Sequence, residues 1–551
     1  DCPAQPPGQN QLVENETNSN EVCRTDSLAV CHIPPGNTRN AHTIYVPWSA
    51  LKAHLMHGDL IGFCPDENNG QDSDNDGISD YREIRDGTNP LDPGSAATEL
   101  KGPVYTLWNR ALNMTNILEL VNQSNDNKTV TVALHEMNGR LLHQTAVPIE
   151  AMSEVDLILN DMPGFSTNPY GLVRIDFEGR IDGRVFFYRS GEDNDYEFAF
   201  DVPLVNASFG TAAVSFNTFQ PSEHPAESNN AVLNWLSLVN LTGSMQHYTV
   251  KTYNQDGQPL ITRHVYIPAY GRADIDGGHV SAGPSMVGLQ EIIPEDDAAP
   301  YLAQLIRYGS NAPLGQMPTH YDFAFALTAK SGNGNIALAP ISRMFGEDNW
   351  LELANSLGQP VGVTLRFLRA SGEEMWHKSI VLPPHGQQHF FAGGEGLLAV
   401  GENGTAVIEP QVLNSIIAQS MFYFRNRSEQ GRVSAMYGSQ AKEALARSIF
   451  GSYNLFLDMH NYLNVFNAED HTVRVQIGVS TAAGIQTNTF SIPPHGATNF
   501  SLHDSALFGT AADTYGVAAV SSDTPAALLA EVVRLRYVGN SVDFAAATPV
   551  R

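Results

Sequence analysis

Twelve residues near the start of the chain place oxygen ligands at the spacing of a calcium-binding loop. The segment Asp72-Ser-Asp-Asn-Asp-Gly-Ile-Ser-Asp-Tyr-Arg-Glu83 puts carboxylates at loop positions 1, 3, 5, 9 and 12, namely Asp72, Asp74, Asp76, Asp80 and Glu83. A hard dication prefers six to eight oxygens at about 2.4 Å. Gly77 permits the sharp turn at position 6, and Ile78 adds its backbone carbonyl. The spacing therefore predicts a calcium site.

The residues that follow this loop extend the pattern. They read Asp86-Gly-Thr-Asn89-Pro-Leu-Asp92-Pro. With the loop, they make residues 72–95 resemble the bacterial version of the thrombospondin type 3 calcium repeat. The resemblance implies an extracellular protein in which calcium stiffens a linker between surface domains, and a single unit implies one rigid joint rather than a stalk. Asn89 and Asp92 are candidate ligands of a second calcium ion.

Upstream of the loop, a short segment is rich in histidine. His54 and His57 are three residues apart, so on a short helix they could share a face, and His32 or His42 could complete an imidazole site for zinc or copper. Alternatively, the four histidines pack or form hydrogen bonds inside a small disulfide-bonded module. The segment resembles a cysteine-bounded module seen beside calcium repeats in secreted bacterial proteins, a resemblance that implies no activity.

All four cysteines of the chain lie within its first 64 residues. An even number confined to a small segment favours disulfides made in an oxidising compartment, with zinc thiolates as the alternative. These residues are Cys2, Cys23, Cys31 and Cys64. The chain begins at Asp1 and shows no leader pattern, so we expect a processed, secreted chain, extracellular or on the cell surface.

Composition excludes several classes of function. Lys and Arg number 31 against 59 Asp and Glu, a formal charge of −28, which argues against a partner that is nucleic acid or anionic lipid. No run of 18 apolar residues is present, so the sequence predicts no transmembrane segment. With 551 residues, the chain is long enough for several domains.

From residue 100 onward, three markers recur four times. The first is a seven-residue segment bounded by asparagines, which starts at Asn116, Asn234, Asn349 and Asn461 and ends at Asn122, Asn240, Asn355 and Asn467. The second is a proline 32 to 34 residues later, at Pro148, Pro268, Pro383 and Pro493. The third is an arginine after an apolar run, at Arg189, Arg307, Arg425 and Arg536. Markers in register indicate a repeated structural unit.

Each repeat alternates apolar and polar residues around turn signals. Asn138-Gly139 and Asp256-Gly257 each follow such a stretch, which is typical of β-hairpins. We therefore predict a mainly β protein with four tandem immunoglobulin-like or related two-sheet sandwiches of about seven strands. The expected ranges are a polar extended segment at 1–30, a Cys/His-rich module at 31–65, a calcium loop and linker at 66–99, and sandwiches at 100–208, 209–333, 334–446 and 447–551.

The recurrent residues have a structural interpretation. We expect the asparagines to bond their own backbone at strand ends, and the arginines to close a hairpin or pair with a nearby acid such as Asp322 or Asp543. His385 and His495 lie in identical Pro-Pro-His-Gly segments and are expected to be turn residues.

Together these features predict a secreted, calcium-binding structural protein, with the sandwiches in a rod. The sequence contains no nucleophile elbow, zinc-protease motif or phosphate-binding loop, so we expect no enzyme. The hypothesis is a self-assembling filament or layer subunit whose partners are other copies or surface polymers, with residues 1–30 reaching a neighbour. The alternative is a carbohydrate- or host-binding adhesin, and an extracellular hydrolase is a third reading.

Overall fold

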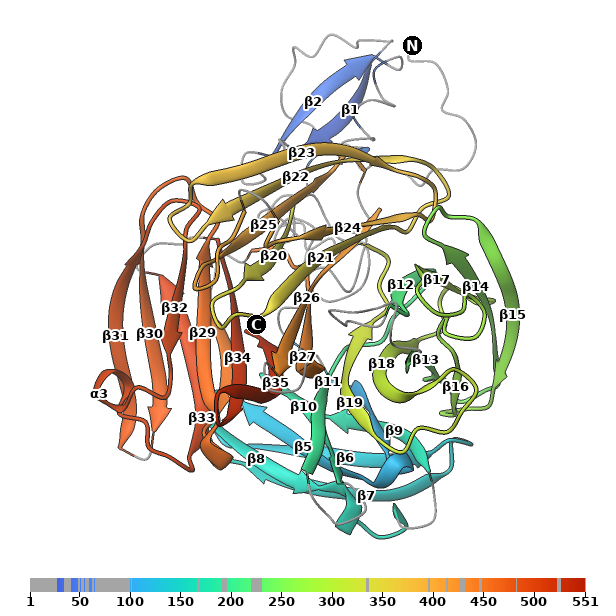
Figure 1. Cartoon of the computed structure of the whole chain (residues 1–551), viewed down its shortest axis with the longest axis horizontal. Helices are drawn as coiled ribbons and strands as arrows, with labels where there is room; N and C mark the ends of the chain where they lie inside the picture. Colours follow the sequence, from blue (N-terminus) through green and yellow to red (C-terminus); the bar gives the residue numbers. More distant parts are fainter. Residues whose placement is uncertain are drawn as a thin grey trace, which may run out of the picture.

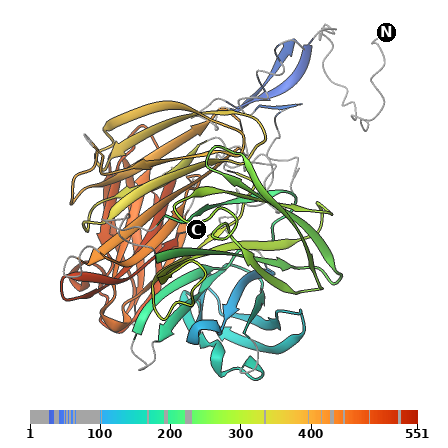
Figure 2. The same cartoon turned by 45° about the vertical axis from the view of Figure 1, so that its right-hand side comes forward.

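The computed structural model describes a small head and four larger β units. The described residues are 27–33, 41–47, 50, 54, 59–61, 64, 100, 102–165, 169–190, 196–219, 230–332, 336–394, 397–412, 415–426, 432–444, 448–481, 483–522 and 527–550. The head sheet has the order β2-β1-β3, with β1 (Ser27–His32), β2 (His42–Pro47) and β3 (Leu60–Ile61). It lies outside the ring formed by the four units, as both Figure 1 and Figure 2 show.

The first two units have the same strand plan. The first contains β4 (Val104–Asn109), β5 (Met114–Asn122), β6 (Lys128–Glu136), β7 (Leu141–Ile149), β8 (Ser153–Ile158), β9 (Tyr170–Asp176), β10 (Ile181–Ser190) and β11 (Tyr196–Pro203), with short 3-10 turns η2 (Ala111–Asn113) and η3 (Leu159–Asp161). The second contains β12 (Ala212–Asn217), β13 (Asn230–Asn240), β14 (Gln246–Asn254), β15 (Pro259–Ile267), β16 (Arg272–Asp276), β17 (Val287–Pro294), β18 (Tyr301–Pro313) and β19 (Tyr321–Thr328).

The last two units repeat the plan. The third contains β20 (Ala337–Ser342), β21 (Asp348–Asn355), β22 (Val361–Arg369), β23 (Glu374–Leu382), β24 (Gln387–Phe391), β25 (Asn403–Pro410), β26 (Ile416–Asn426) and β27 (Arg432–Gln440). The fourth contains β28 (Ile449–Asn454), β29 (His460–Asn467), β30 (Val473–Thr481), β31 (Gly484–Ile492), β32 (Ala497–Ser501), β33 (Tyr515–Ser522), β34 (Leu528–Val538) and β35 (Ser541–Pro549), with η6 (Phe456–Asp458) and α3 (Ser505–Phe508).

Every unit is a sandwich of two four-stranded antiparallel sheets. In the first unit the orders are β4-β9-β6-β7 and β8-β5-β10-β11, and the other three repeat them strand for strand. The mainly β, two-sheet prediction is therefore confirmed, with eight strands per unit rather than about seven. Because the first and second strands lie in different sheets, the order differs from that of immunoglobulin domains, in which strands A and B share one sheet.

The four units form a closed ring, so the expectation of a rod is wrong. The last strand of each unit lies near the centre, and we call β11, β19, β27 and β35 the axial strands (Figure 1). β11 packs beside β19, β19 beside β27, and β27 beside β35, which returns to β11. Phe186 and Phe544 share a buried apolar cluster across this last contact. Closure buries apolar surface on the first and fourth units, and a rod would leave this surface exposed to water.

At each of the four joints, one unit lays its first sheet on the second sheet of the next. Apolar pairs such as Leu289 with Ala354, and Leu338 with Phe466, bury these faces. Three joints add a second contact, because the hairpin turn of one unit docks on the proline-bearing loop of the next. The backbone N–H of Gln387 donates to the carbonyl of Gln255 at 3.0 Å. The other two bonds are Arg272 to Met137 at 2.8 Å and Ala497 to Ala370 at 3.0 Å.

The marker asparagines have the structural role expected from the sequence. Asn116, Asn234, Asn349 and Asn461 each accept a bond from the backbone N–H at the end of the preceding strand, at 2.7 to 3.4 Å. Asn122, Asn240, Asn355 and Asn467 each donate to the backbone carbonyl four residues later, at 2.6 to 2.8 Å. His385 and His495 are turn residues with positive φ, as predicted.

The marker arginines do not share one structural position. Arg536 pairs with Asp543 at 2.6 Å, as expected, and Arg425 pairs with Asp348 at 2.7 Å. Arg536 comes directly before the β-bulge of its strand, whereas Arg307 lies two residues before the corresponding position. The side chain of Arg307 is therefore buried in the joint, where it lies 3.7 Å from Glu352 instead of pairing with Asp322. The near-constant sequence spacing hid this shift.

Candidate metal sites

The predicted calcium loop lies outside the described residues. This holds for all its ligands and for the second candidate pair, that is Asp72, Asp74, Asp76, Ile78, Asp80, Glu83, Asn89 and Asp92. The described part of the chain therefore offers two places to examine for metal chemistry, the head and the joints of the ring. Within that part, no helix has the length and apolar character needed to cross a bilayer.

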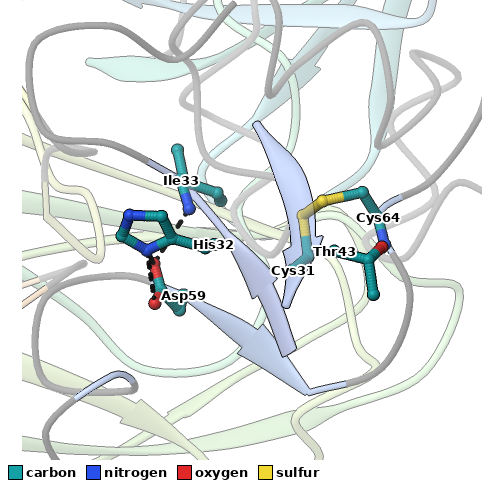
Figure 3. Close-up of a disulfide and its surroundings, with 6 residues drawn as sticks. All are labelled: Cys31, His32, Ile33, Thr43, Asp59 and Cys64. Carbon is teal, nitrogen blue, oxygen red and sulfur yellow. Dashed lines mark hydrogen bonds and ion pairs between the residues drawn. A yellow bond between two sulfur atoms is a disulfide. The ribbon is translucent and has the colours of Figure 1, made fainter. Parts of the chain in front are cut away.

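A disulfide closes the head. Cys31 on β1 is bonded to Cys64, with Cα atoms 4.4 Å apart, and Cys31 is fully buried (Figure 3). The backbone N–H of Cys64 donates to the hydroxyl of Thr43 on β2 at 2.9 Å, so Cys64 is held to both β1 and β2. The expected disulfide is thus confirmed for this pair, while Cys2 and Cys23 lie outside the described residues. Such a bond supports a sheet that is too small to be held by burial alone.

Beside the disulfide, two histidines meet one buried carboxylate. Asp59 has no exposed side-chain surface, and it accepts hydrogen bonds from Nδ1 of His32 at 2.9 Å and from Nδ1 of His54 at 2.6 Å. The backbone N–H of Ile33 donates to the same carboxylate at 2.9 Å (Figure 3). The end of β1 positions His32 and Ile33, and the segment just before β3 positions Asp59.

The structure brings together three of the four predicted histidines. The ring of His32 lies 5.5 Å from that of His42 and 5.9 Å from that of His54, measured between centroids. His57 lies outside the described residues. Potential ligand atoms of His32, His54 and Asp59 all lie within 4.8 Å of one another. An imidazole that donates Nδ1–H to a carboxylate turns the lone pair of Nε2 toward a metal, the arrangement that orients zinc-binding histidines.

Sequence reasoning missed Asp59, although a signal was available. Asp59 is the only acidic residue between Cys31 and Cys64 in the sequence. A single carboxylate among several histidines in a disulfide-bounded segment is a natural hydrogen-bond acceptor for them, because burial of an unpaired carboxylate is costly. Imidazole nitrogens whose rings are oriented by a carboxylate fit zinc or copper.

Comparison with known proteins adds one firm identification. Residues 72–93 match the family model of the bacterial TSP3 repeat, a repeat that is typical of extracellular proteins and implies calcium binding. No curated protein matches the chain.

Solved structures similar to the chain include β-glucuronidase from Ruminococcus gnavus. The complex with an N1-substituted uronic isofagomine is 10% identical over 47% of this chain and 42% of that chain, with a TM-score of 0.12. The complex with uronic deoxynojirimycin is 9% identical over 65% of this chain and 48% of that chain, with a TM-score of 0.10. The chain thus covers less than half of these enzymes, and so low a similarity carries no argument about fold or function.

Proposed function

We propose that this chain, which carries a bacterial TSP3 repeat, is a secreted, calcium-binding structural protein of the bacterial surface or extracellular matrix. In this proposal the ring is the building block of a filament or layer, and its partners are other copies of itself. Calcium at the loop stiffens the joint between head and ring, because the metal neutralises carboxylates that otherwise repel one another. The loop ligands are Asp72, Asp74, Asp76, Ile78, Asp80 and Glu83, with Asn89 and Asp92 at a second calcium. No catalytic activity is assigned to the chain.

The observation that carries the proposal is the set of unpaired strand edges at the outer circumference of the ring. Each first sheet ends there in a strand of nine residues, and we call β7, β15, β23 and β31 the rim strands (Figure 1). Within the described residues, each rim strand pairs on one side only, which leaves a row of backbone donors and acceptors along the other. Natural proteins usually protect such edges, because they pair readily with another chain.

Protection differs among the rim strands, and β31 has the least. β7 contains Pro148, β15 carries Arg263 and starts with a proline, and β23 carries Lys378, so all three have features that oppose edge pairing. The sequence of β31, Gly-Ile-Gln-Thr-Asn-Thr-Phe-Ser-Ile, has neither charge nor proline, and Ile485 is 57% exposed. We therefore place the contact between copies at β31, by addition of a strand from a second ring.

Electron microscopy of the secreted protein tests assembly. Wild-type protein should form ordered filaments or layers, and substitution of both Thr487 and Thr489 on β31 by lysine should separate the rings at this contact, because like charges would face each other where two β31 strands pair. The control is Ser379→Lys on β23, an edge that already has a lysine, and it should assemble normally. Single rings of wild-type protein under every condition would refute assembly.

A chelator separates the role of calcium from assembly itself. Removing calcium from assembled material should loosen the position of the heads while the rings remain paired through β31. An Asp76→Ala variant should reproduce this state in the presence of calcium, because the loop loses a ligand at its centre. Loss of all assembly in that variant would mean that calcium acts on the contact between rings rather than on the joint.

The adhesin is the second candidate, and exposed aromatic side chains favour it. Trp235 and Trp350 occupy the same position of neighbouring units, and each is nearly 40% exposed. Trp235 packs against His279 and Trp350 against Phe391, with ring centroids 4.9 and 5.1 Å apart. Such rings can stack on a sugar face. Glycan-array binding that disappears in Trp235→Ala and Trp350→Ala variants would establish this function, and absence of binding by wild-type protein would dismiss it.

We further propose that the head binds zinc or copper through the imidazoles that Asp59 orients. Calorimetric titration should show one metal per chain, with affinity lowered roughly 10- to 100-fold by Asp59→Asn, because a lost orienting carboxylate weakens metal binding by that much. His143→Ala on the rim strand β7 is the control and should change nothing. Equal affinity in the Asp59→Asn variant would exclude this site.

A further inference from the structure

The joint that closes the ring, between the fourth and first units, differs chemically from the other three. The described residues show no docked hairpin turn there, and buried charges meet instead. Arg534 on β34 donates to Glu119 on β5 at 2.8 Å, and both Arg534 and Arg184 donate to the Ser452 hydroxyl, at 2.9 and 3.0 Å. The side chains of Arg534, Arg184 and Glu119 are at most 3% exposed.

Three carboxylates lie together on the face of the first unit at this closing joint. Asp156 on β8 is directly opposite Glu119 on β5, and Glu154 is two residues before Asp156, so all three side chains point to one face of the sheet. Carboxylate oxygens of the three residues lie within 4.8 Å of one another. Glu119 and Glu154 are buried, while Asp156 is exposed and gives the group a route to solvent.

Both arginines form ion pairs with Glu119, and in the described part of the chain neither forms one with Glu154 or Asp156. Among the described residues, neither carboxylate oxygen of Glu154 has a hydrogen-bond partner, although the residue is only 4% exposed. Burial and the neighbouring Glu119 raise the pKa of Glu154 well above its ordinary value, and the same causes raise the pKa of Asp156 to about 7. A buried carboxylate with no partner is among the costliest groups in a protein interior.

The other joints, which use the same strand positions, have no such surplus. In the second unit, the positions of Glu154 and Asp156 are taken by Arg272 and Asp274, which form an ion pair at 2.7 Å. The three positions contain Ser237, Arg272 and Asp274 in the second unit, Glu352, Gln387 and His389 in the third, and Asn464, Ala497 and Asn499 in the fourth. None of these joints has more than one acid at these positions, so the cluster is specific to the place where the chain closes on itself.

We propose that Glu119, Glu154 and Asp156 bind a divalent cation, calcium by their donor chemistry, which holds the ring closed. All the donors are carboxylate oxygens, the ligands of hard cations, and no soft ligand is among them. The ion neutralises Glu154 and Asp156 and takes Oε2 of Glu119, which lies 3.4 Å from Nε of Arg184, while Arg534 continues to pair with Oε1. This site is separate from the TSP3 loop and does not depend on the proposed assembly.

Terbium luminescence of the full chain tests the site directly. Tyr515 begins β33, which packs beside β8, the strand that carries Glu154 and Asp156, so it is placed to sensitise a bound lanthanide. The loop must first be disabled, which the background variant Asp72→Asn with Glu83→Gln and Asp92→Asn provides. This background should still show saturable emission that calcium displaces. Its absence would overturn the proposal.

Two substitutions and a control locate the binding. In the background variant, Glu154→Gln and Asp156→Asn should each weaken terbium and calcium binding at least ~10-fold, because each removes a charged ligand. Asp274→Asn, at the position of Asp156 in the second unit, should leave the affinity unchanged. Unchanged affinity in Glu154→Gln would overturn the site, and the exposed Asp156 provides the test if the buried substitution prevents folding.

Thermal unfolding distinguishes a cation from a proton on Glu154. With calcium about 100-fold above Kd, the background protein should unfold roughly 2 °C or more above its midpoint in chelator. Glu154→Gln should lose this calcium-dependent rise while being at least as stable in chelator, because the amide removes a buried charge. If Glu154 is simply protonated, neither protein responds to calcium and the proposal fails.

Discussion

At the scale of single residues, the marker asparagines form hydrogen bonds that recur in all four units. Asn240 donates to the carbonyls of Ser244, Ile267 and Pro268, at 2.6, 3.1 and 3.0 Å, and so ties the end of β13 to the loop that follows β15. The bond to Ser244 spans four residues and could be expected from sequence. The other two span 27 and 28 residues, so only the fold reveals them.

Replacing Asn240 with alanine should destabilise the second unit. The side chain is fully buried, so its loss leaves two or three carbonyls without a donor, at a cost of about 1–3 kcal/mol in unfolding free energy. Urea unfolding measures the change. Gln258→Ala, an exposed amide on the same unit, should change stability by less than about 0.5 kcal/mol. Equal effects of the two substitutions would contradict the assigned role.

The carboxylates of the closing joint should make stability depend on pH. In the folded protein the pKa of Asp156 is about 7, whereas in an unfolded chain an aspartate ionises near ~3.9. Between these values the folded state holds the extra proton, so its stability is fully present at the acid end and is lost as pH rises toward 7. The raised pKa of Asp201, about 6, acts in the same direction.

In chelator, the midpoint temperature of unfolding should therefore decrease as the pH is raised from 5 to 8. The Asp156→Asn variant should show a smaller decrease. Thermal unfolding across this range, with wild type and variant in identical buffers, measures the difference in slope. Calcium should also flatten the profile of the wild type, because a bound cation replaces the proton. Parallel profiles for wild type and variant would show that Asp156 does not titrate in this window.

At the scale of elements, the hairpin turns do more than reverse the chain. Gly257 has φ of +76°, and a Cβ there would lie 1.7 Å from the carbonyl oxygen of Pro384 in the next unit. Gly139 and Gly372 make the same approach to Ala269 and Pro494. The Asp256-Gly257 signature predicted the hairpin correctly. It could not predict the docking, because the loop on which the turn docks lies more than a hundred residues away in the sequence. A solvent-exposed hairpin has the same sequence signature.

Gly257→Ala should therefore damage the joint between the second and third units. Gly315 is the matched control, since its φ of +86° imposes similar strain on alanine while nothing lies within 4 Å of the added Cβ. We expect Gly315→Ala to cost about 1 kcal/mol and Gly257→Ala at least ~2 kcal/mol more, because a backbone contact must also open. Chemical unfolding and limited proteolysis at the joint measure both, and equal costs would mean that the docked turn contributes nothing.

At the scale of the whole molecule, closure of the ring is the feature that sequence analysis missed. The repeats, their hairpins and the sandwich architecture follow from local patterns, because period-two alternation and turn residues act over a few positions. Closure depends on contacts such as Arg534 with Glu119, which are 415 residues apart. In sequence, Arg534 lies two residues from the marker Arg536, and nothing local distinguishes the arginine of the closing joint from the one that pairs with Asp543.

A double-mutant cycle should show that the Arg534–Glu119 pair holds the ring closed. Glu119→Gln removes the acid shared by two buried arginines and should cost roughly 3–5 kcal/mol, whereas Arg534→Met leaves Glu119 paired with Arg184 and should cost less. The double variant should cost less than the sum of the two. Small-angle scattering should report a larger radius of gyration for the single variants. Arg366→Met, which breaks a half-exposed pair with Glu409, should cost no more than about 1 kcal/mol. Additive costs would exclude direct coupling across the joint.

Closure also fixes how many units the ring itself can have. An open row of domains tolerates the gain or loss of one member through recombination, because each member contacts only its neighbours. Here each unit turns the chain by about a quarter of a circle before β35 meets β11, so a chain with three or five units could not join its ends through the same surfaces. Variation in this lineage should therefore occur in loops and in rim strands other than β31, and the number of units in the ring should stay at four.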